Sequence, residues 1–194
     1  MADSFANLTD KKAVITGASS GIGRATALLL AHGGADVVVH CKSSIEAATS
    51  VANEIRNLGR KAEVIAADLG NQGECARLVA GAWEAFGGID IWVNNAGVDL
   101  LTGEAATLDF ELKLQQLFEV DIRSSMLLTR AVGSLMTSAG GGAIVNIGWD
   151  QADRGMDGDS GEMFAASKNA IMGFTRSVAV SLAPEVRVNC VAPG

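Results

Sequence analysis

A glycine-rich segment near the N-terminus carries the residues whose types and spacing best fit ligand chemistry. The segment follows the apolar residues 13–15 and precedes a helical pattern over residues 25–30. It consists of Thr16, Gly17, Ala18, Ser19, Ser20, Gly21, Ile22 and Gly23. A glycine-rich turn between a strand and a helix is the arrangement that binds the phosphates of a dinucleotide. The alternative is a tight turn that binds nothing, and these residues alone leave both open.

Each glycine has a separate role in a phosphate-binding turn. Gly17 lets the chain turn sharply away from the strand, and Gly21 lets the backbone approach a pyrophosphate. Gly23 lets the helix pack closely against the sheet. The first N–H groups of the helix then point at the anion, with the positive end of the helix dipole behind them. The segment therefore predicts a dinucleotide site.

A second group of chemistry-bearing residues lies in the loop predicted over residues 148–161. Its acidic residues, together with one just beyond it, are Asp150, Asp153, Asp157, Asp159 and Glu162. A carboxylic acid whose pKa is raised by its surroundings can serve as a general acid. The preferred interpretation is a solvated acidic loop, because charged side chains usually face water. The spacing of these carboxylates does not fit an EF-hand calcium loop, so we predict no metal site.

Short apolar segments alternate with helical patterns along the chain, and these elements must position the groups above. The predicted strands cover residues 12–16, 37–39, 62–67, 91–93, 143–147 and 186–191. The predicted helices cover residues 21–32, 45–58, 72–86, 109–137 and 162–182. This order predicts an α/β fold with a doubly wound parallel sheet that helices cover on both faces. Ligands of such sheets bind at the carboxyl ends of the strands, where the strand order reverses.

Composition and charge limit the classes of function. The 194 residues, 48% of them hydrophobic, fit one domain over residues 1–194 with its own core. The net charge of −7 and the lack of a Lys/Arg run argue against a nucleic-acid partner. No apolar run is long enough to span a membrane, and residues 1–12 lack a signal-peptide pattern, so we expect a cytoplasmic protein. The three cysteines are too far apart in the sequence for a disulfide framework or a zinc site; they are Cys41, Cys75 and Cys190.

Several short motifs follow the glycine-rich turn in a fixed order. They are Asp68-Leu69, Asn94-Asn95-Ala96-Gly97, Ile144-Val145-Asn146-Ile147, Ser167-Lys168 and Val188-Asn189-Cys190-Val191-Ala192-Pro193-Gly194. Their order and spacing resemble the short-chain dehydrogenase/reductase family over nearly the whole chain, and particularly its 3-oxoacyl-carrier-protein reductase-like members. The resemblance implies a Rossmann-like fold, a nicotinamide dinucleotide cofactor and an oxidoreductase acting on a carbonyl or alcohol. It also implies a homodimer or homotetramer, formed through the helices predicted over residues 109–137 and 162–182.

The resemblance assigns further cofactor-binding roles beyond the glycine-rich turn. Asp68 would hydrogen-bond the adenine, with Leu69 beside it. Asn94, Ala96 and Gly97 would line the adenosine ribose and steady the central sheet. Each of these positions has a structural alternative, because the aspartate could cap the turn after its strand and the second motif could form only a tight turn.

The residues after the second predicted strand bear on the choice between NAD(H) and NADP(H). NAD-selective sites usually place an acidic residue there to bind the ribose hydroxyls. Here the segment over residues 40–44 reads His-Cys-Lys-Ser-Ser, and Asp36 comes before the strand. Lys42 and the two serine hydroxyls could bind a 2′-phosphate, although a solvated loop lysine is an equally open interpretation. We favour NADP(H), with NAD(H) as the alternative.

The catalytic pattern of that family is incomplete in this sequence. Family members use a tyrosine phenol, a lysine four residues later that lowers the pKa of the phenol, a serine hydroxyl and an asparagine that supports a proton relay. Lys168 is present and is also expected to contact the cofactor, but the other positions hold Phe164, Trp149 and Asp121. The chain contains no tyrosine. Because loss of a general acid costs about 10²–10⁴ in rate, the usual carbonyl reduction is not expected.

Two interpretations of function follow from this pattern. One is an oxidoreductase with a different proton donor, and the other is a catalytically inactive cofactor-binding pseudoenzyme that senses or scaffolds. A purely structural subunit is the least favoured, because the glycine-rich turn is intact. The substrate, a small molecule, cannot be identified from these residues. We also hypothesise that Asp121 and Lys168 form an ion pair in place of the relay.

The C-terminal strand is predicted to be an exposed edge of the sheet. Family members usually continue past the Pro-Gly pair with a substrate-covering segment and a last strand, whereas this sequence stops at Gly194. Residues 186–191 would then present unpaired backbone groups, which proteins normally cover. We therefore expect six strands with the last one of the family missing, in a truncated chain or beside a partner.

Overall fold

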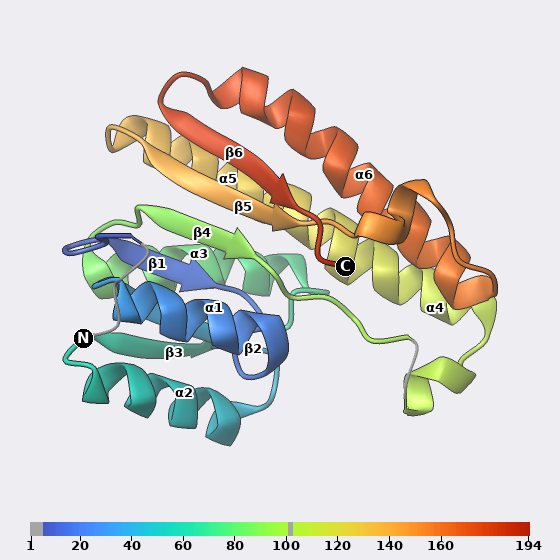
Figure 1. Cartoon of the computed structure of the whole chain (residues 1–194), viewed down its shortest axis with the longest axis horizontal. Helices are drawn as coiled ribbons and strands as arrows, with labels where there is room; N and C mark the ends of the chain where they lie inside the picture. The colour runs from blue at the N-terminus through green and yellow to red at the C-terminus, as the bar shows by residue number, and fades with distance from the viewer. Residues whose placement is uncertain (1–5, 101–102) are drawn as a thin grey trace.

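The structure, a computed structural model that describes residues 6–100 and 103–194, is built around one six-stranded sheet (Figure 1). Its strands are β1 (Lys12–Ile15), β2 (Asp36–Cys41), β3 (Ala62–Ala66), β4 (Ile91–Asn94), β5 (Gly142–Ile147) and β6 (Val186–Val191). All neighbouring strands are parallel, in the order β3-β2-β1-β4-β5-β6. The order reverses between β1 and β4, which is where such sheets bind ligands. This arrangement confirms the predicted α/β, Rossmann-like fold.

Helices alternate with these strands, as the hydrophobic pattern predicts. The helices are α1 (Gly21–His32), α2 (Ile45–Asn57), α3 (Gln72–Phe86), α4 (Phe110–Leu117), α5 (Ser125–Ser138) and α6 (Asp159–Leu182). Shorter turns are η1 (Glu104–Thr107) and η3 (Asp150–Asp153), both 3₁₀, and the π-helical η2 (Phe118–Ser124). The helix predicted over residues 109–137 is thus interrupted by a π turn. α6 starts three residues earlier than predicted, directly after Gly158, whose φ of 81° ends the preceding loop.

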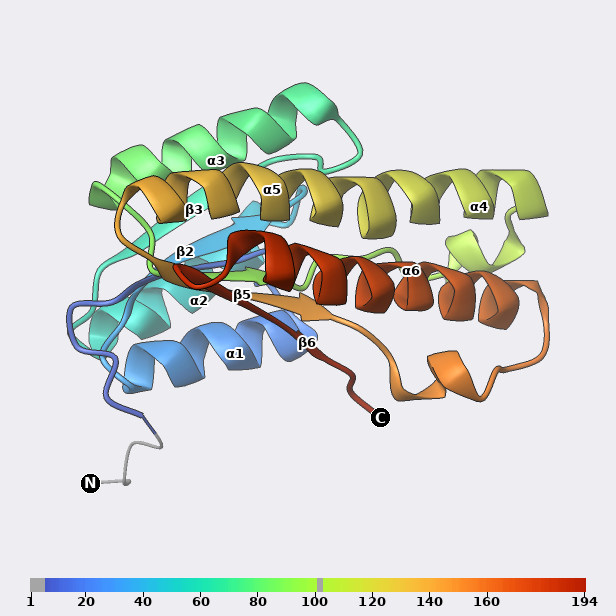
Figure 2. The same cartoon turned by 90° about the horizontal axis from the view of Figure 1, so that it is seen from above.

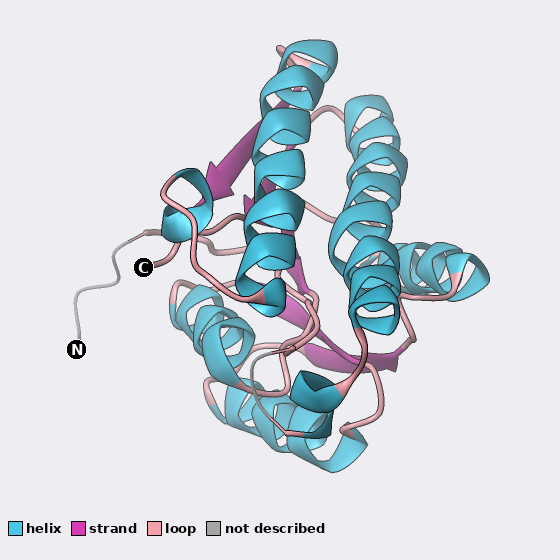
Figure 3. Ribbon diagram, turned by 90° about the vertical axis from the view of Figure 1, so that its right-hand side faces the viewer, coloured by secondary structure: helices cyan, strands magenta, loops and turns pink. Residues whose placement is uncertain are grey.

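The two faces of the sheet have separate cores, because successive strand residues point to opposite faces. Ile15 and Val39 pack with α1 and α2, whereas Val14 and Val38 pack with α3, α5 and α6. Figure 3 shows helices on both sides of the strands. The α4–α5 helices run beside α6 in Figure 2, and both α4 and α5 contact it. These layers hold the carboxyl ends of β1 and β4 in a fixed position.

β6 lies at one edge of the sheet, as predicted. Val186 and Val188 are buried against the α6 side, and Arg187, Asn189 and Val191 between and after them are exposed. Residues 1–5, part of the segment in which no signal peptide is expected, lie outside the described residues.

A chain of buried polar side chains joins β4 and β5 to the helices behind them. The Trp92 indole donates to Asn94 Oδ1 at 2.7 Å, and Asn94 Nδ2 donates to Asn146 Oδ1 at 2.8 Å and to Thr129 Oγ1 at 2.9 Å. Asn146 Nδ2 in turn donates to Thr175 Oγ1 at 2.9 Å. Because buried polar groups need partners, this series of hydrogen bonds fixes α5 and α6 against the sheet.

Candidate functional site

A cavity of about 750 Å³ opens at the carboxyl ends of β1 to β4. Its wall combines the glycine-rich turn, the ends of β2 and β3, the segment after β4, η2 and the first half of α6. The predicted cofactor residues in this wall are Gly17, Ser19, Ser20, Gly21, Ile22, Lys42, Asp68, Leu69, Ala96, Gly97 and Lys168. A cavity of this size falls within the range that holds small ligands and cofactors.

The glycine-rich turn has a backbone that only glycine tolerates well. Gly17 and Gly21 have φ values of 64° and 54°, in the left-handed region. A Cβ on Gly17 would lie 2.9 Å from Ala96 Cα, and one on Gly23 would overlap the Gly17 carbonyl oxygen. Gly23 is buried behind the turn and is absent from the cavity wall, in keeping with a packing role. A Cβ on Gly21 would meet nothing within 4 Å, so open space faces the start of α1.

The segment after β4 is tied to this turn by Asn95, which the sequence analysis does not assign to the site. Asn95 Nδ2 donates to the carbonyl oxygens of Thr16 at 2.9 Å and Gly17 at 3.2 Å. The Thr16 hydroxyl accepts from the backbone N–H groups of Asn95 and Ala96, each at 2.9 Å. Asn94, which the sequence analysis does assign, is instead 4% exposed and directed into the core. Side chains two residues apart on a strand point to the same face, whereas adjacent ones point to opposite faces. An apolar Trp92 directed into the core therefore indicates that Asn94 points into the core as well and that Asn95 points away from it.

His40 is a second residue of the wall without an assignment from sequence. Its imidazole is 1% exposed, and Nδ1 accepts from the Gly17 N–H at 3.1 Å. Nε2 lies 3.0 Å from the Ala67 carbonyl oxygen, to which it donates. Burial holds the pKa of His40 below its ordinary value, although the hydrogen bond to Ala67 opposes this. Ser44, one of the two serines considered for the 2′-phosphate, also lines the wall, whereas Ser43 does not. The remaining unassigned wall residues are Cys41, Ala67, Val98, Asp99 and Val120.

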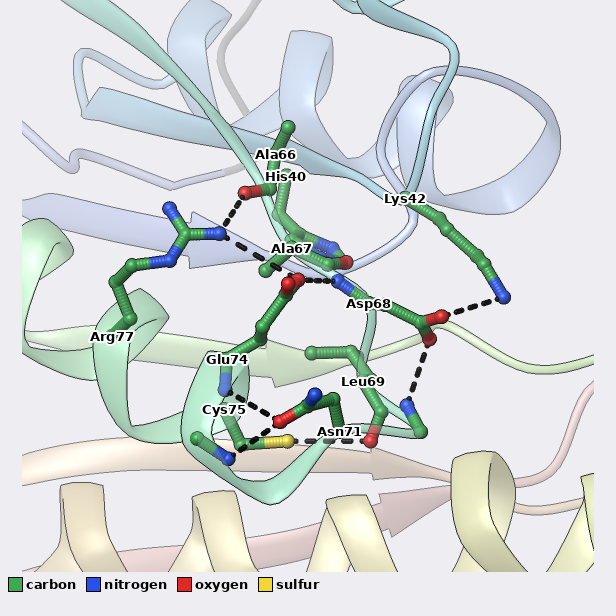
Figure 4. A network of polar contacts seen from close by, with 12 residues as sticks. His40, Lys42, Ala66, Ala67, Asp68, Leu69, Asn71, Glu74, Cys75 and Arg77 are labelled. Carbon is green, nitrogen blue, oxygen red and sulfur yellow. Dashed lines mark hydrogen bonds and ion pairs between the residues drawn. The ribbon is translucent and has the colours of Figure 1, made fainter.

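Lys42 and Asp68 form an ion pair across the ends of β2 and β3 (Figure 4). Lys42 Nζ lies 2.9 Å from Asp68 Oδ2, and the side chains are 67% and 41% exposed. The other carboxylate oxygen accepts from the Gly70 N–H at 3.0 Å, which is the turn-capping role left open for Asp68. The hydrogen bond from Lys42 is the main reason that the pKa of Asp68 lies below its ordinary value.

Asp121 and Lys168 form the ion pair hypothesised from the sequence. Lys168 Nζ lies 2.9 Å from Asp121 Oδ2, and the Val98 N–H donates to Asp121 Oδ1 at 3.0 Å. The Asp121 side chain is 0% exposed and that of Lys168 is 14% exposed, so water screens the pair little. Asp121 sits in the π turn η2, a feature often found at functional sites.

The positions of the other two catalytic groups are apolar. Phe164 lines the cavity, whereas Trp149 lies outside its wall. The two rings contact each other edge to face, with centroids 6.4 Å apart and planes inclined by 65°. Neither side chain can give a proton to a substrate as a phenol or hydroxyl does.

Within the described residues, no acidic side chain of the loop before α6 lines the cavity. Asp159 instead pairs with Lys113, with Asp159 Oδ2 at 3.0 Å from the buried Nζ. This hydrogen bond is the main reason that the pKa of Asp159 lies below its ordinary value. A general acid needs a raised pKa, so Asp159 is not suited to that role. The described parts of the chain also contain no group of three His, Cys, Asp or Glu residues placed to hold a metal.

The strand, the glycine-rich turn and the cavity occur in a chain whose sequence matches a known protein family. Residues 11–194 match the sequence profile described as short chain dehydrogenase. A 3-oxoacyl-[acyl-carrier-protein] reductase of Synechocystis sp. is 39% identical over 190 residues, which span 96% of this chain and 74% of the relative. The chain belongs to the short-chain dehydrogenase family. It is therefore a member of an oxidoreductase family, as the resemblance implies.

Solved structures of the family superpose closely on this chain. A short chain dehydrogenase from Burkholderia cenocepacia in complex with NADP has a TM-score of 0.87 at 37% identity, over 97% of this chain and 75% of that one. A 7α-hydroxysteroid dehydrogenase complexed with NADH and a 7-oxo bile acid has a TM-score of 0.86 at 32% identity, over 97% of this chain and 72% of that one. Both forms of nicotinamide cofactor thus occur among structural neighbours.

No helix in the described ranges combines the length and apolar character needed to cross a membrane.

We predict that Lys168→Met lowers the free energy of unfolding by about 3–5 kcal/mol, because it leaves the Asp121 carboxylate buried without a counterion. Lys11→Met is the matched control, since Lys11 pairs with Asp90 at 3.2 Å on the surface and should cost at most about 1 kcal/mol. Urea unfolding of both variants measures the difference. The double variant Asp121→Asn/Lys168→Met should recover much of the loss, and equal costs for the two single variants would contradict the prediction.

Proposed function

We propose that this protein binds NADP(H) in the cavity; a carbonyl or alcohol as small-molecule substrate belongs to the second candidate function, an active reductase. The observation that supports binding most directly is the opening of α1 into the cavity at Gly21. N–H groups at the start of a helix, with the helix dipole behind them, suit a pyrophosphate. In this proposal Asp68 and Leu69 border the adenine, and Ala96 and Gly97 border the adenosine ribose.

Lys42 supports NADP(H) over NAD(H). It follows β2 directly, at the place where NAD-selective sites usually carry an acidic residue for the ribose hydroxyls. Its ammonium pairs with Asp68 on the surface, and exposed pairs of this kind are weak enough to exchange partners. A 2′-phosphate offers more negative charge and more acceptor oxygens than one carboxylate. NAD(H) stays the alternative cofactor, because the structurally similar 7α-hydroxysteroid dehydrogenase was solved with NADH.

Cofactor binding without the family's usual turnover is the function that the geometry favours. A bound nicotinamide would supply hydride, and the chain would have to supply a proton at the carbonyl oxygen of the substrate. Phe164 has no proton to give, Trp149 lies outside the cavity wall, and Lys168 is held by Asp121 at 2.9 Å. We therefore place the protein as a cofactor-binding pseudoenzyme with a sensing or scaffolding role. A reductase that uses a different proton donor is the second candidate, and the family membership supports it.

Exposed apolar side chains on α4 and α5 support a homodimer or homotetramer. They are Phe110, Leu112, Leu114, Leu127 and Leu135, with Phe118 between the two helices. Phe110, Leu114 and Phe118 recur every four residues, which places them on one side of the helix, and apolar groups gathered in this way favour contact with another protein surface. We propose that a second copy covers them, which light scattering of the purified protein would test. The expected absence of nucleic-acid and membrane partners and the cytoplasmic location stay predictions.

The first prediction from the proposed function concerns the phosphate-binding turn. Gly21→Ala should weaken NADPH binding at least about tenfold, because its methyl group enters the space in front of α1. Gly59→Ala is the control, since Gly59 has a φ of 78°, meets nothing within 4 Å and lies outside the cavity wall. Both variants should lose about 1–2 kcal/mol of stability from the left-handed backbone. Calorimetric titration checks this, and equal affinities of the two variants for NADPH would count against the proposed site.

The second prediction concerns the choice of cofactor. Lys42→Gln should weaken NADPH binding about tenfold and leave NADH binding nearly unchanged, because only NADPH carries the 2′-phosphate. Lys61→Gln, an exposed lysine outside the cavity wall, should change neither affinity. Titration of the three proteins with both cofactors gives the comparison. If Lys42→Gln weakens NADH as much as NADPH, Lys42 does not select the phosphate.

The third prediction separates the two candidate functions. The wild-type protein should show a raised melting temperature with NADPH and no oxidation of NADPH in the presence of a panel of ketones. Loss of the general acid alone accounts for about 10²–10⁴ in rate. Absorbance of NADPH follows the reaction, with an active family reductase as the positive control. Rapid oxidation of NADPH by the wild-type protein would favour the reductase and exclude the pseudoenzyme.

A further inference from the structure

The buried imidazole of His40 joins three separate segments of the cavity wall. Its Nδ1 accepts from the N–H of Gly17 at 3.1 Å, and its Nε2 donates to the carbonyl oxygen of Ala67 at 3.0 Å. Backbone bonds run alongside, from Ala18 N to His40 O at 2.8 Å and from Ala67 N to Cys41 O at 3.0 Å. The side chain therefore ties the turn after β1 and the end of β3 to β2.

The partners of His40 fix one protonation state. Gly17 presents an N–H, which is a donor, so Nδ1 must be unprotonated to accept from it. Ala67 presents a carbonyl oxygen, so Nε2 must carry the proton. An imidazolium would carry a second N–H and could not accept from Gly17. Burial, which disfavours the charged form, acts in the same direction.

The bond to Gly17 lies where the phosphate cradle begins. Gly17 has a φ of 64° and lies between β1 and α1, and its N–H donates to the His40 imidazole. The hydrogen bond to His40 directs the Gly17 N–H toward β2. It thereby fixes the orientation of the backbone from which the chain continues to the start of α1. Ala67 directly precedes Asp68, which borders the other end of the cavity beside Lys42 (Figure 4).

We propose that His40, in its neutral form with the proton on Nε2, is a positioning residue that holds the phosphate-binding turn in its binding geometry. This inference rests on the proposed binding of NADP(H). His40 would not itself touch the phosphates, and it acts through Gly17. Removal of the acceptor would leave the Gly17 N–H without this partner, and because glycine has wide backbone freedom the turn could then adopt other conformations.

Two amide variants separate the two hydrogen bonds. The amide oxygen of His40→Asn can take the place of Nδ1 and accept from Gly17, whereas the longer side chain of His40→Gln reaches the place of Nε2 and leaves Gly17 without its acceptor. We expect His40→Asn to bind NADPH within about threefold of the wild type and His40→Gln to bind it at least about tenfold more weakly. Similar melting temperatures of the two variants would show that the difference does not come from general destabilisation.

A pH series gives a second readout that does not need the cofactor. The ionisable side chains of the adjoining segments are Cys41, the paired Lys42 and Asp68, and on α3 the paired Glu74 and Arg77. All of them are retained in His40→Asn. Because the pKa of His40 is lowered in the folded state, the unfolded chain takes up the proton first, and stability is lost as pH falls below the unfolded value of about 6.5. The urea midpoint should therefore fall further in the wild type than in His40→Asn between about pH 7.5 and about pH 5.5.

The outcomes distinguish this inference from the proposed function. If the wild type does not bind NADPH, the proposed function fails, and ¹⁵N NMR of the imidazole still tests the tautomer. If the wild type binds NADPH and His40→Gln binds it equally well, the positioning role is overturned. Equal loss of binding in His40→Asn and His40→Gln would also overturn it, because the Gly17 bond would then not be the one that matters.

Discussion

The close packing of the glycine-rich turn against the segment after β4 is the contact on which the rest of the site depends. Gly17 and Ala96 approach so closely that one added carbon would bring atoms to 2.9 Å. Asn95 and the hydroxyl of Thr16 hold the two backbones at this separation with four hydrogen bonds. The parallel sheet brings these segments together because β1 and β4 are neighbours at the point where strand order reverses. Without this contact, neither the turn nor the cavity beside it would have a defined shape.

The two ion pairs of the cavity wall differ in the free-energy cost of separating their charges. Where β2 and β3 end, Lys42 and Asp68 are well exposed, so their pairing contributes little and can be exchanged for contact with a ligand. Between η2 and α6, Asp121 is fully buried, and separating it from Lys168 would leave an uncompensated charge in the interior. The first pair is therefore suited to respond to a ligand, whereas the second stabilises one arrangement of η2 and α6. This difference follows from burial, since the two N–O distances are both 2.9 Å.

The sequence predicts the elements of this fold well and the directions of its side chains less well. The alternation of apolar segments and helical patterns is enough to predict the sheet and its helices. Strands that are buried on both faces must be apolar along their whole length, and this leaves a clear pattern in the sequence. Asn94 and Asn95 are adjacent and chemically identical, so only the register of β4 decides which one faces the core. His40 was missed because its partners lie 23 and 27 residues away and are backbone groups, which leave no trace in the identity of a side chain. The pairing of Asp121 with Lys168 was predictable because both positions belong to one family motif pattern and carry opposite charges.

The replacements at the catalytic positions are physically coupled. Lys168 is mostly buried, and a buried ammonium needs a counterion or a set of acceptors. Phe164 offers it neither, because its ring has no oxygen, and Asp121 supplies the missing negative charge. Changing Asp121 alone to asparagine would remove the counterion while the phenyl ring stayed in place, and changing Phe164 alone to tyrosine would place a phenol beside an ammonium already held by a carboxylate. Under the proposed pseudoenzyme function, a working proton-transfer site would require changes at several of these positions together, and the effects of single substitutions are not expected to add.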